Sequence, residues 1–426
     1  MSEPAQQVAD APRPPLPARG LLAPLRHRDF RWLVSGQMLS TFGDMAFLVA
    51  LPFIVLRDGD AGDLALILTM LGVGRVVGSP IGGMLSDRWS PRSVMLVSDL
   101  ARAAVLAGLI ALIGSGGQGL LWLGIGVAVL GALEGLFLPA YWAVMPALLP
   151  EEELASGNAV SEAVIVVAVV AGPLVGGIAM ASTAPAAVLA VNALTFLISA
   201  GTLLKMSGRR ERALGAPGTT EPEPRGGGQD DARSGFWSFA RGSRLFQAIL
   251  MMAGALQLTS AGLVSVALPV FVDQEFSDGR QVFGLLLSAH GAGLLAGTLA
   301  AGPAWKVSRP GYLAVGLVVL DGLALLALTR LPGLAALMIS TAVLGLVAGA
   351  LSIIALTLLQ RIAPPAVRGR VMAAFTSVTI AAFPISAAVI GLIVTGLGVE
   401  AAFVAGGLGV LVVSVIGITQ RAVREA

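Results

Sequence analysis

The stretch LALILTMLGVGRVVGSPIGGML (residues 64–85), the break SDRWSPRS (86–93) and the stretch VMLVSDLARAAVLAGLIALIG (94–114) decide the fold class of this chain. Each long stretch is predominantly apolar and is long enough for a helix to cross a hydrocarbon core about 30 Å thick. Neither alternates polar and apolar residues as the strands of a membrane β-barrel do. We therefore expect two neighbouring transmembrane helices joined by a short charged loop.

Apolar stretches of this kind recur along the chain, in which 56% of 426 residues are hydrophobic and 12% are charged. Soluble domains carry about 25% charged residues, so the composition excludes an ordinary soluble enzyme. We predict an all-α membrane protein with twelve spans in two pseudo-symmetric bundles of six. The first bundle (29–206) has spans near 31–56, 64–85, 94–114, 120–147, 157–181 and 185–206, and the second (242–420) has spans near 244–272, 281–304, 311–330, 333–360, 370–397 and 400–420.

Three polar segments lie outside these bundles: an N-terminal tail (1–28), a C-terminal tail (421–426) and residues 207–241. The third is rich in Gly, Pro, Arg and Glu, which predicts a flexible linker. With alternate loops assigned to the two sides, 22 of the 27 Lys and Arg fall on the side of the N-terminus, against Arg57, Arg280 and Arg330 on the other. This excess predicts an inner (plasma) membrane protein whose tails and linker are cytoplasmic.

Motifs for catalysis and for ATP binding are missing from the sequence. It has no P-loop, no nucleophile elbow and no His-Glu-x-x-His zinc motif. There is no cysteine, and His27 and His290 are too few for a metal cluster. We therefore expect no enzymatic activity, cofactor, metal, direct ATP use or nucleic-acid partner. The expected partners are a small-molecule substrate, protons and the lipid bilayer, and the chain is expected to be a monomer.

Four charged residues fall within the predicted spans at membrane depth: Asp44, Arg75, Glu134 and Asp321. A charge at the centre of a span costs about 2.5–3.5 kcal/mol on translocon-insertion scales, so each requires a partner or a purpose. We expect Asp44 and Glu134 to bind protons or cations, with Arg75 holding one of them charged. The alternative is a permanent ion pair that locks two helices together. Asp321 is either a group of the substrate cavity or a hydrogen-bonded acid without transport function.

The loop Gly83-Met84-Leu85-Ser86-Asp87-Arg88-Trp89-Ser90-Pro91-Arg92 resembles motif A of the major facilitator superfamily. The match depends on Gly83, Leu85, Asp87, Arg88 and Arg92, whereas Ser90 and Pro91 depart from the pattern. The resemblance implies a gate at the cytoplasmic side, in which Asp87 faces the start of the eleventh span. The other expected members of this gate are Asp99, Arg102, Arg368 and Arg370.

A second likeness lies in the fifth span, Ala171-Gly172-Pro173-Leu174-Val175-Gly176-Gly177. It resembles the antiporter motif C of drug exporters in the same superfamily. Glycines allow close helix contact and proline bends a helix. The resemblance therefore implies that Gly172, Pro173, Gly176 and Gly177 mark a protein that exports its substrate. Ordinary glycine packing is the alternative reading.

Five further stretches extend the likeness over residues 25–420: 29–31, 42–44, 138–146, 158–159 and 368–373. They resemble the drug:proton antiporter branch that contains macrolide-efflux and enterobactin-export proteins. The resemblance implies proton-coupled efflux of a small hydrophobic or amphipathic compound by alternating access. Import of a nutrient, a membrane receptor and an intramembrane enzyme are the alternatives. The glycine and proline pattern of the fifth span weighs against import.

Overall fold

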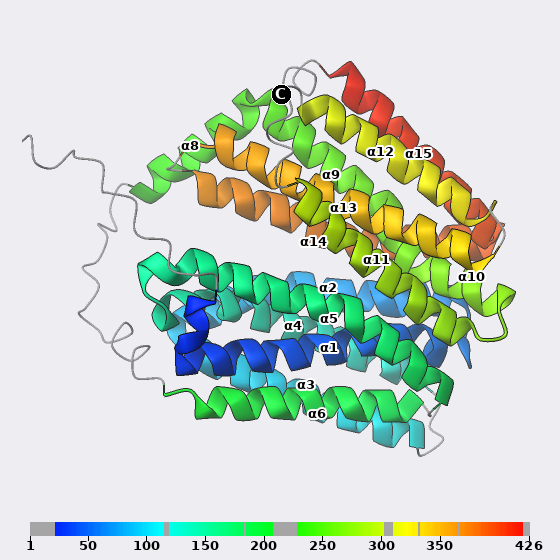
Figure 1. Ribbon diagram of the computed structural model, residues 1–426, viewed down its shortest axis with the longest axis horizontal. Helices are drawn as coiled ribbons and strands as arrows, with labels where there is room; N and C mark the ends of the chain where they lie inside the picture. Colours follow the sequence, from blue (N-terminus) through cyan, green and yellow to red (C-terminus); the bar gives the residue numbers. More distant parts are fainter. Residues whose placement is uncertain are drawn as a thin grey trace, which may run out of the picture.

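The computed structural model of this chain describes residues 22–114, 119–182, 185–207, 228–301, 310–330, 333–364 and 367–420. Every regular element in these ranges is helical. Twelve of the helices are long and apolar enough to cross a membrane. Figure 1 shows them as two bundles that lie side by side. The predicted fold class of a twelve-helix membrane protein is confirmed.

The first bundle consists of α1 (Arg28–Leu56), α2 (Ala61–Arg88), α3 (Pro91–Gly114), α4 (Leu120–Leu148), α5 (Leu154–Ser182) and α6 (Pro185–Lys205). The second consists of α9 (Arg244–Gly262) continued by α10 (Leu268–Glu275), then α11 (Gly279–Ala301), α12 (Pro310–Leu328), α13 (Leu334–Ile362), α14 (Arg368–Leu397) and α15 (Val399–Thr419). Because the number of spans is even, α1 begins and α15 ends on the same side of the bundle. This side is called the terminus side below.

The seventh span differs from the single helix expected over 244–272. A π-helical segment, Leu263–Ala267, joins α9 to α10. At this point Ser386 of α14 reaches into the helix: its Oγ accepts from the Gly262 N–H at 2.7 Å and donates to the Leu258 carbonyl at 2.8 Å. A side chain inserted into the backbone ladder changes the local helix geometry. The interruption therefore depends on a residue of a distant helix.

The predicted flexible linker requires a correction. Its first part, 208–227, lies outside the described residues, as do residues 1–21 and the C-terminal tail 421–426. The remainder is helical, because α8 runs from Gly228 to Gly242. Phe236, Phe239 and Ala240 lie three and four residues apart, so they share one face of this helix. That face packs against Phe246 of α9 and neighbouring apolar residues of α13 and α14.

Glycine rows bring two helix pairs into backbone contact, one pair in each bundle. In the first bundle Gly74 and Gly78 of α2 lie against the backbone of Ala128 and Ala132 in α4, where a Cβ atom would clash. In the second, Gly345 of α13 lies in the same way against the backbone of α11. Small residues let membrane helices approach this closely. The equivalent pairs reflect the internal two-fold repeat of the chain.

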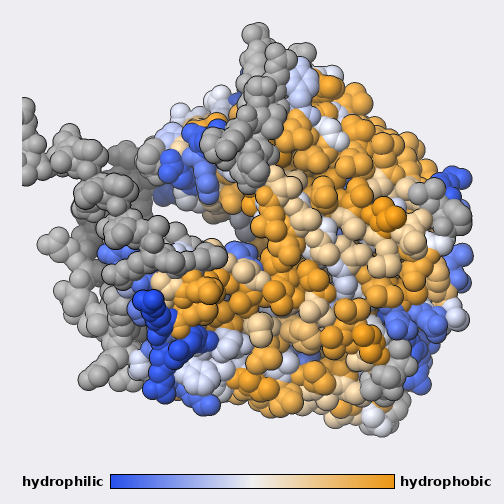
Figure 2. Space-filling model, in the orientation of Figure 1, coloured by the Kyte–Doolittle hydropathy of each residue, from blue (hydrophilic) through white to orange (hydrophobic). Residues whose placement is uncertain are grey.

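Contacts between the bundles lie away from the terminus side. Helices α2 and α14 meet from Gly62 beside Thr395 to Gly72 beside Pro384. Helices α5 and α11 meet where Gly177 faces Gly284. These residues belong to the part of each helix remote from the terminus side. Figure 2 shows the surface hollowed between the bundles on the terminus side. The conformation is therefore open toward the terminus side and closed on the opposite side.

Candidate functional site

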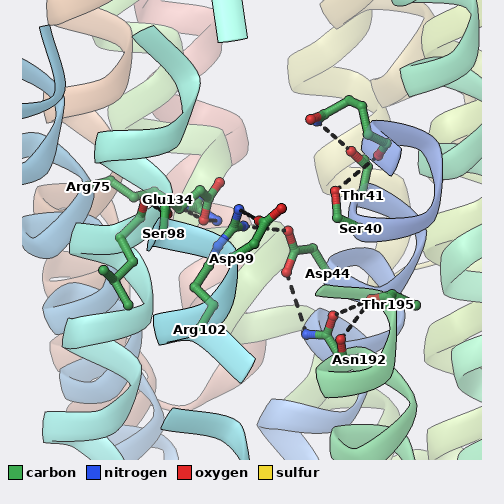
Figure 3. A network of polar contacts seen from close by, with 12 residues as sticks. Ser40, Thr41, Asp44, Arg75, Ser98, Asp99, Arg102, Glu134, Asn192 and Thr195 are labelled. Atoms are coloured by element: carbon green, nitrogen blue, oxygen red, sulfur yellow. Dashed lines mark hydrogen bonds and ion pairs between the residues drawn. The ribbon is translucent and has the colours of Figure 1, made fainter. Parts of the chain in front are cut away.

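An ion pair between α2 and α4 borders the space between the bundles. Nε and Nη2 of Arg75 each lie 2.8 Å from Oε2 of Glu134 (Figure 3). The side chains are 28% and 37% exposed, so neither is sealed in the protein. Arg75 and Glu134 lie on the two helices that pack closely here, and this packing fixes the distance between their side chains. The structure thus brings together two of the four charged groups predicted at membrane depth.

Asp44 belongs to a second cluster, in which Arg102 is the central residue. Arg102 Nη2 donates to Oδ1 of Asp99 at 2.6 Å, and Nη1 lies 3.5 Å from Oδ2 of Asp44. The amide of Asn192 on α6 donates to Oδ1 of Asp44, also at 3.5 Å. Arg102 is buried, with the ring centroids of Phe137 and Phe196 at 4.7 and 4.2 Å from its guanidinium carbon.

The two clusters meet at a small cavity lined by Asp44, Arg75, Arg102, Glu134 and Asn192. Figure 3 shows the Arg75–Glu134 pair on one side of Arg102 and Asp44 on the other. Together the clusters hold three carboxyl groups and two guanidinium groups. When every group is ionised, one negative charge is left over. Binding of one proton or one cation balances it.

A larger cavity of about 600 Å³ lies between the bundles. Its first-bundle lining is limited to Leu48, Pro52, Leu68 and Arg75, and the second bundle supplies the rest. The lining extends from residues near the terminus side to Phe283, whose ring meets Phe53 edge-on at 5.8 Å between centroids. This aromatic pair lies at the end of the cavity remote from the terminus side. The cavity is thus mainly a feature of the second bundle.

Asp321 lines this large cavity from α12, together with His290 of α11. It is 6% exposed, and Ser260 Oγ donates to its Oδ2 at 3.2 Å. Among the described residues no Lys, Arg or His forms an ion pair with it. Asp321 is therefore separate from the first-bundle charge clusters, as its position in the second bundle leads one to expect.

The expected cytoplasmic gate is only partly assembled. Asp87 and Arg88 are exposed at the end of α2, and within the described residues Asp87 makes no ion pair with Arg368 or Arg370. Arg368 instead donates to the carbonyl of Ala363 at 3.5 Å. Gly83 lies near the same end of α2, where an added Cβ would meet no atom within 4 Å.

Three residues of the predicted gate have partners away from Asp87 in this structure. Asp99 and Arg102 lie with Asp44 at membrane depth, because the inward face of α3 turns them toward α1 and α6 instead of the α2–α3 loop. Arg92 donates from Nε to the carbonyl of Leu203 at 2.7 Å and from Nη2 to that of Leu204 at 3.0 Å. It therefore caps the last turn of α6, whose unpaired carbonyls attract a cation.

The glycine and proline motif of α5 forms two helix contacts. Gly172 and Gly176 lie against α1 at Met45 and Ala46, within the first bundle. Gly177 lies against Gly284 of α11, and the Pro173 carbonyl lies beside the same glycine. The motif is thus part of the surface at which the two bundles meet.

Asn192 was not predicted as a site residue, although it is an amide in the middle of an apolar stretch. The spacing of Asp99 and Arg102, three residues apart and inside a span, was the other available signal. Both indicate polar groups that need partners within the bundle. The sequence does not reveal how α3 and α6 are rotated about their axes, and this rotation decides which residues these polar groups contact.

Two six-helix bundles, a cavity between them and buried charges beside it define a secondary transporter. A sequence model of the Major Facilitator Superfamily matches residues 33–262 and 250–425. The chain belongs to the Major Facilitator Superfamily, and it is a multi-pass membrane transporter of small molecules.

Similar proteins include the multidrug efflux pump Tap of Mycobacterium tuberculosis (strain ATCC 25618 / H37Rv), which is 27% identical over 400 residues, 91% of this chain and 92% of that protein. The enterobactin exporter EntS of Escherichia coli O81 (strain ED1a) is 27% identical over 398 residues, 92% of this chain and 91% of that protein.

Solved structures share the fold. The nucleoside transporter NupG superimposes with a TM-score of 0.67 at 15% identity, over 94% of this chain and 99% of that one. A bacterial homologue of the human lysosomal transporter Spinster, in an inward-facing and unoccupied conformation, gives a TM-score of 0.66 at 14% identity over 95% and 97% of the two chains.

Proposed function

We propose that this transporter is a monomeric exporter of small hydrophobic or amphipathic compounds, driven by proton entry through the inner (plasma) membrane. The terminus side is then cytoplasmic, as the excess of Lys and Arg on that side favours. The similarity to the multidrug efflux pump Tap and the enterobactin exporter EntS supports the direction of transport. The mainly apolar lining of the large cavity supports the class of cargo.

The observation that carries proton coupling is the charge balance of the small cavity. In the two clusters that meet at this cavity, three carboxyl groups, those of Asp44, Asp99 and Glu134, share the two guanidinium groups of Arg75 and Arg102. Asp99 is buried against Arg102 at 2.6 Å, whereas Asp44 has only contacts of 3.5 Å and a 28% exposed side chain. Asp44 is therefore the carboxyl group that we assign to proton binding. Protonation of Asp44 would weaken its contact with Arg102 on α3 and change its hydrogen bond with Asn192 on α6.

Alternating access also requires a gate that closes the terminus side, which is open in this conformation. Helices α2 and α14 diverge toward the terminus side, so Asp87 and the start of α14 are apart in this conformation. Closure on the terminus side would bring Asp87 toward Arg370, whose Nη1 is buried without a hydrogen-bond partner here. An acid near the first turn of a helix is also stabilised by the helix dipole.

Accumulation of a panel of dyes and antibiotics tests this proposal in cells that express the protein, with and without an uncoupler. Cells without the protein are the first control. We expect reduced accumulation of at least one compound and loss of the effect with the uncoupler. Asp44→Asn is expected to abolish the effect, whereas Ser40→Ala, which loses only the bond from Ser40 Oγ to the Gln37 carbonyl, is expected to retain it. Increased accumulation would indicate import, and an effect that survives the uncoupler would contradict proton drive.

A further inference from the structure

Asp321 is a carboxyl group at the wall of a mainly apolar cavity, and no Lys or Arg of the described residues forms an ion pair with it. Ser260 Oγ occupies one of its two oxygen atoms. Within the described part of the chain, the lining also holds Arg75, which is paired with Glu134, and the imidazole of His290. A carboxylate in this position has one hydrogen bond, from Ser260, and no ion pair with a described residue, and an ion left unpaired in an apolar site is costly. A cation from outside the protein would remove that cost.

The aromatic residues of the lining favour one kind of cation. Phe283, Phe375 and Phe383 face the same cavity as Asp321. Ammonium groups are attracted to aromatic faces, and this attraction increases where water is excluded. An acid combined with aromatic rings and a large apolar wall is the chemistry that recognises a lipophilic amine or a quaternary ammonium ion.

We propose that Asp321 anchors the ammonium group of the transported compound, so that the cargo class is lipophilic organic cations. The apolar part of the cargo then occupies the second-bundle lining, which explains why that bundle supplies most of the cavity. This inference rests on the proposed transport function. It also assigns a different role to each bundle. The first bundle binds the proton through its charge clusters, and the second binds the cargo through Asp321.

The test uses the purified full-length chain and two probes of equal shape. One is (3-phenylpropyl)trimethylammonium, and the other is its uncharged isostere with carbon in place of nitrogen. Equilibrium binding is measured without a gradient for the wild type, Asp321→Asn, Asp321→Glu and Ser40→Ala. Because a buried charge pair that loses one partner commonly weakens binding by tenfold or more, we expect Asp321→Asn to weaken binding of the cation by about tenfold.

Binding of the neutral isostere is expected to stay within about twofold in all four proteins, since it lacks the charge that Asp321 recognises. Asp321→Glu keeps the charge and is expected to retain the preference for the cation, as is Ser40→Ala, whose change lies in the first bundle outside the lining of the large cavity. A wild type without preference for the cation overturns the inference. So does an equal loss of both probes in Asp321→Asn.

Failure of the inference and failure of the proposed function are distinguishable. Selective cation binding by a chain that changes the accumulation of no compound contradicts the transport proposal alone. Uncoupler-sensitive export by a chain without cation preference in the binding assay contradicts the inference alone.

Discussion

Arg75 on α2 and Glu134 on α4 meet through a single carboxylate oxygen, with both Nε and Nη2 of the arginine 2.8 Å from Oε2. The pair crosses the same helix contact that Gly74 and Gly78 bring close. It is partly exposed to the cavity, unlike the fully buried contact between Arg102 and Asp99. The two ion pairs therefore lead to different expectations.

Exchange of the Arg75–Glu134 pair separates a structural role from a transport role. Arg75→Glu places two acids side by side and Glu134→Arg places two cations there, so each single variant is expected to lower the thermal midpoint of the purified protein. The double variant restores opposite charges and is expected to recover the midpoint. Recovery of export in the double variant would support a permanent lock between helices, whereas loss of export in a stable protein would support a direct part in proton coupling.

Arg102 is expected to be the most sensitive of the charged residues to substitution. Its side chain is 4% exposed and holds Asp99, which is fully buried. Removing one partner of a buried ion pair costs about 3–5 kcal/mol, so Arg102→Gln should strongly lower stability. The double variant Arg102→Gln with Asp99→Asn leaves no charge within this pair and should regain part of the loss. Thermal unfolding in detergent measures both, and an equal midpoint for Arg102→Gln and wild type would refute the buried pair.

Gly78 is expected to tolerate no side chain, because a Cβ atom there would clash with the Ala132 backbone. Overpacking of this kind costs about 1–3 kcal/mol. Gly201 on α6 is the matched control, since a Cβ atom there meets nothing within 4 Å. Thermal midpoints of Gly78→Ala and Gly201→Ala should therefore differ, with the first lowered and the second equal to the wild type or higher. Equal midpoints would mean that α2 and α4 lie farther apart than described.

The absence of native cysteine makes the orientation directly measurable. Ser90 lies in the α2–α3 loop on the terminus side, and Ser277 lies between α10 and α11 on the opposite side; both are exposed. A membrane-impermeant maleimide added to intact cells should label Ser277→Cys but label Ser90→Cys only after the cells are broken. The reverse pattern would place the termini outside the cytoplasm.

Length and hydrophobicity were sufficient to predict the spans, because a helix must bury about 20 apolar residues to cross a bilayer. The π-helical segment after Gly262 was not predictable, since it depends on Ser386 of a distant helix. The helix α8 was missed because its apolar residues are few and gain their stability by packing on α9.

The site was predicted in part for a related reason. Asp44, Arg75 and Glu134 stand out as charges in apolar stretches, and the structure places them around one small cavity. The position of Asp99 and Arg102 along α3 follows from the sequence, but their direction around the helix axis does not, and the structure places them with Asp44. The location of the large cavity depends on how whole bundles pack, which no single stretch of sequence records.

Proton coupling through Asp44 is tested most directly in liposomes that contain only the purified chain, loaded with a compound exported in the cellular assay. An imposed pH gradient, acidic on the side remote from the terminus side, should drive that compound uphill in the wild type. Asp44→Asn should bind the compound and exchange it down its own gradient, yet gain nothing from the pH gradient. Equal pH-driven accumulation by the wild type and Asp44→Asn would contradict the assignment of Asp44 as the proton-binding group.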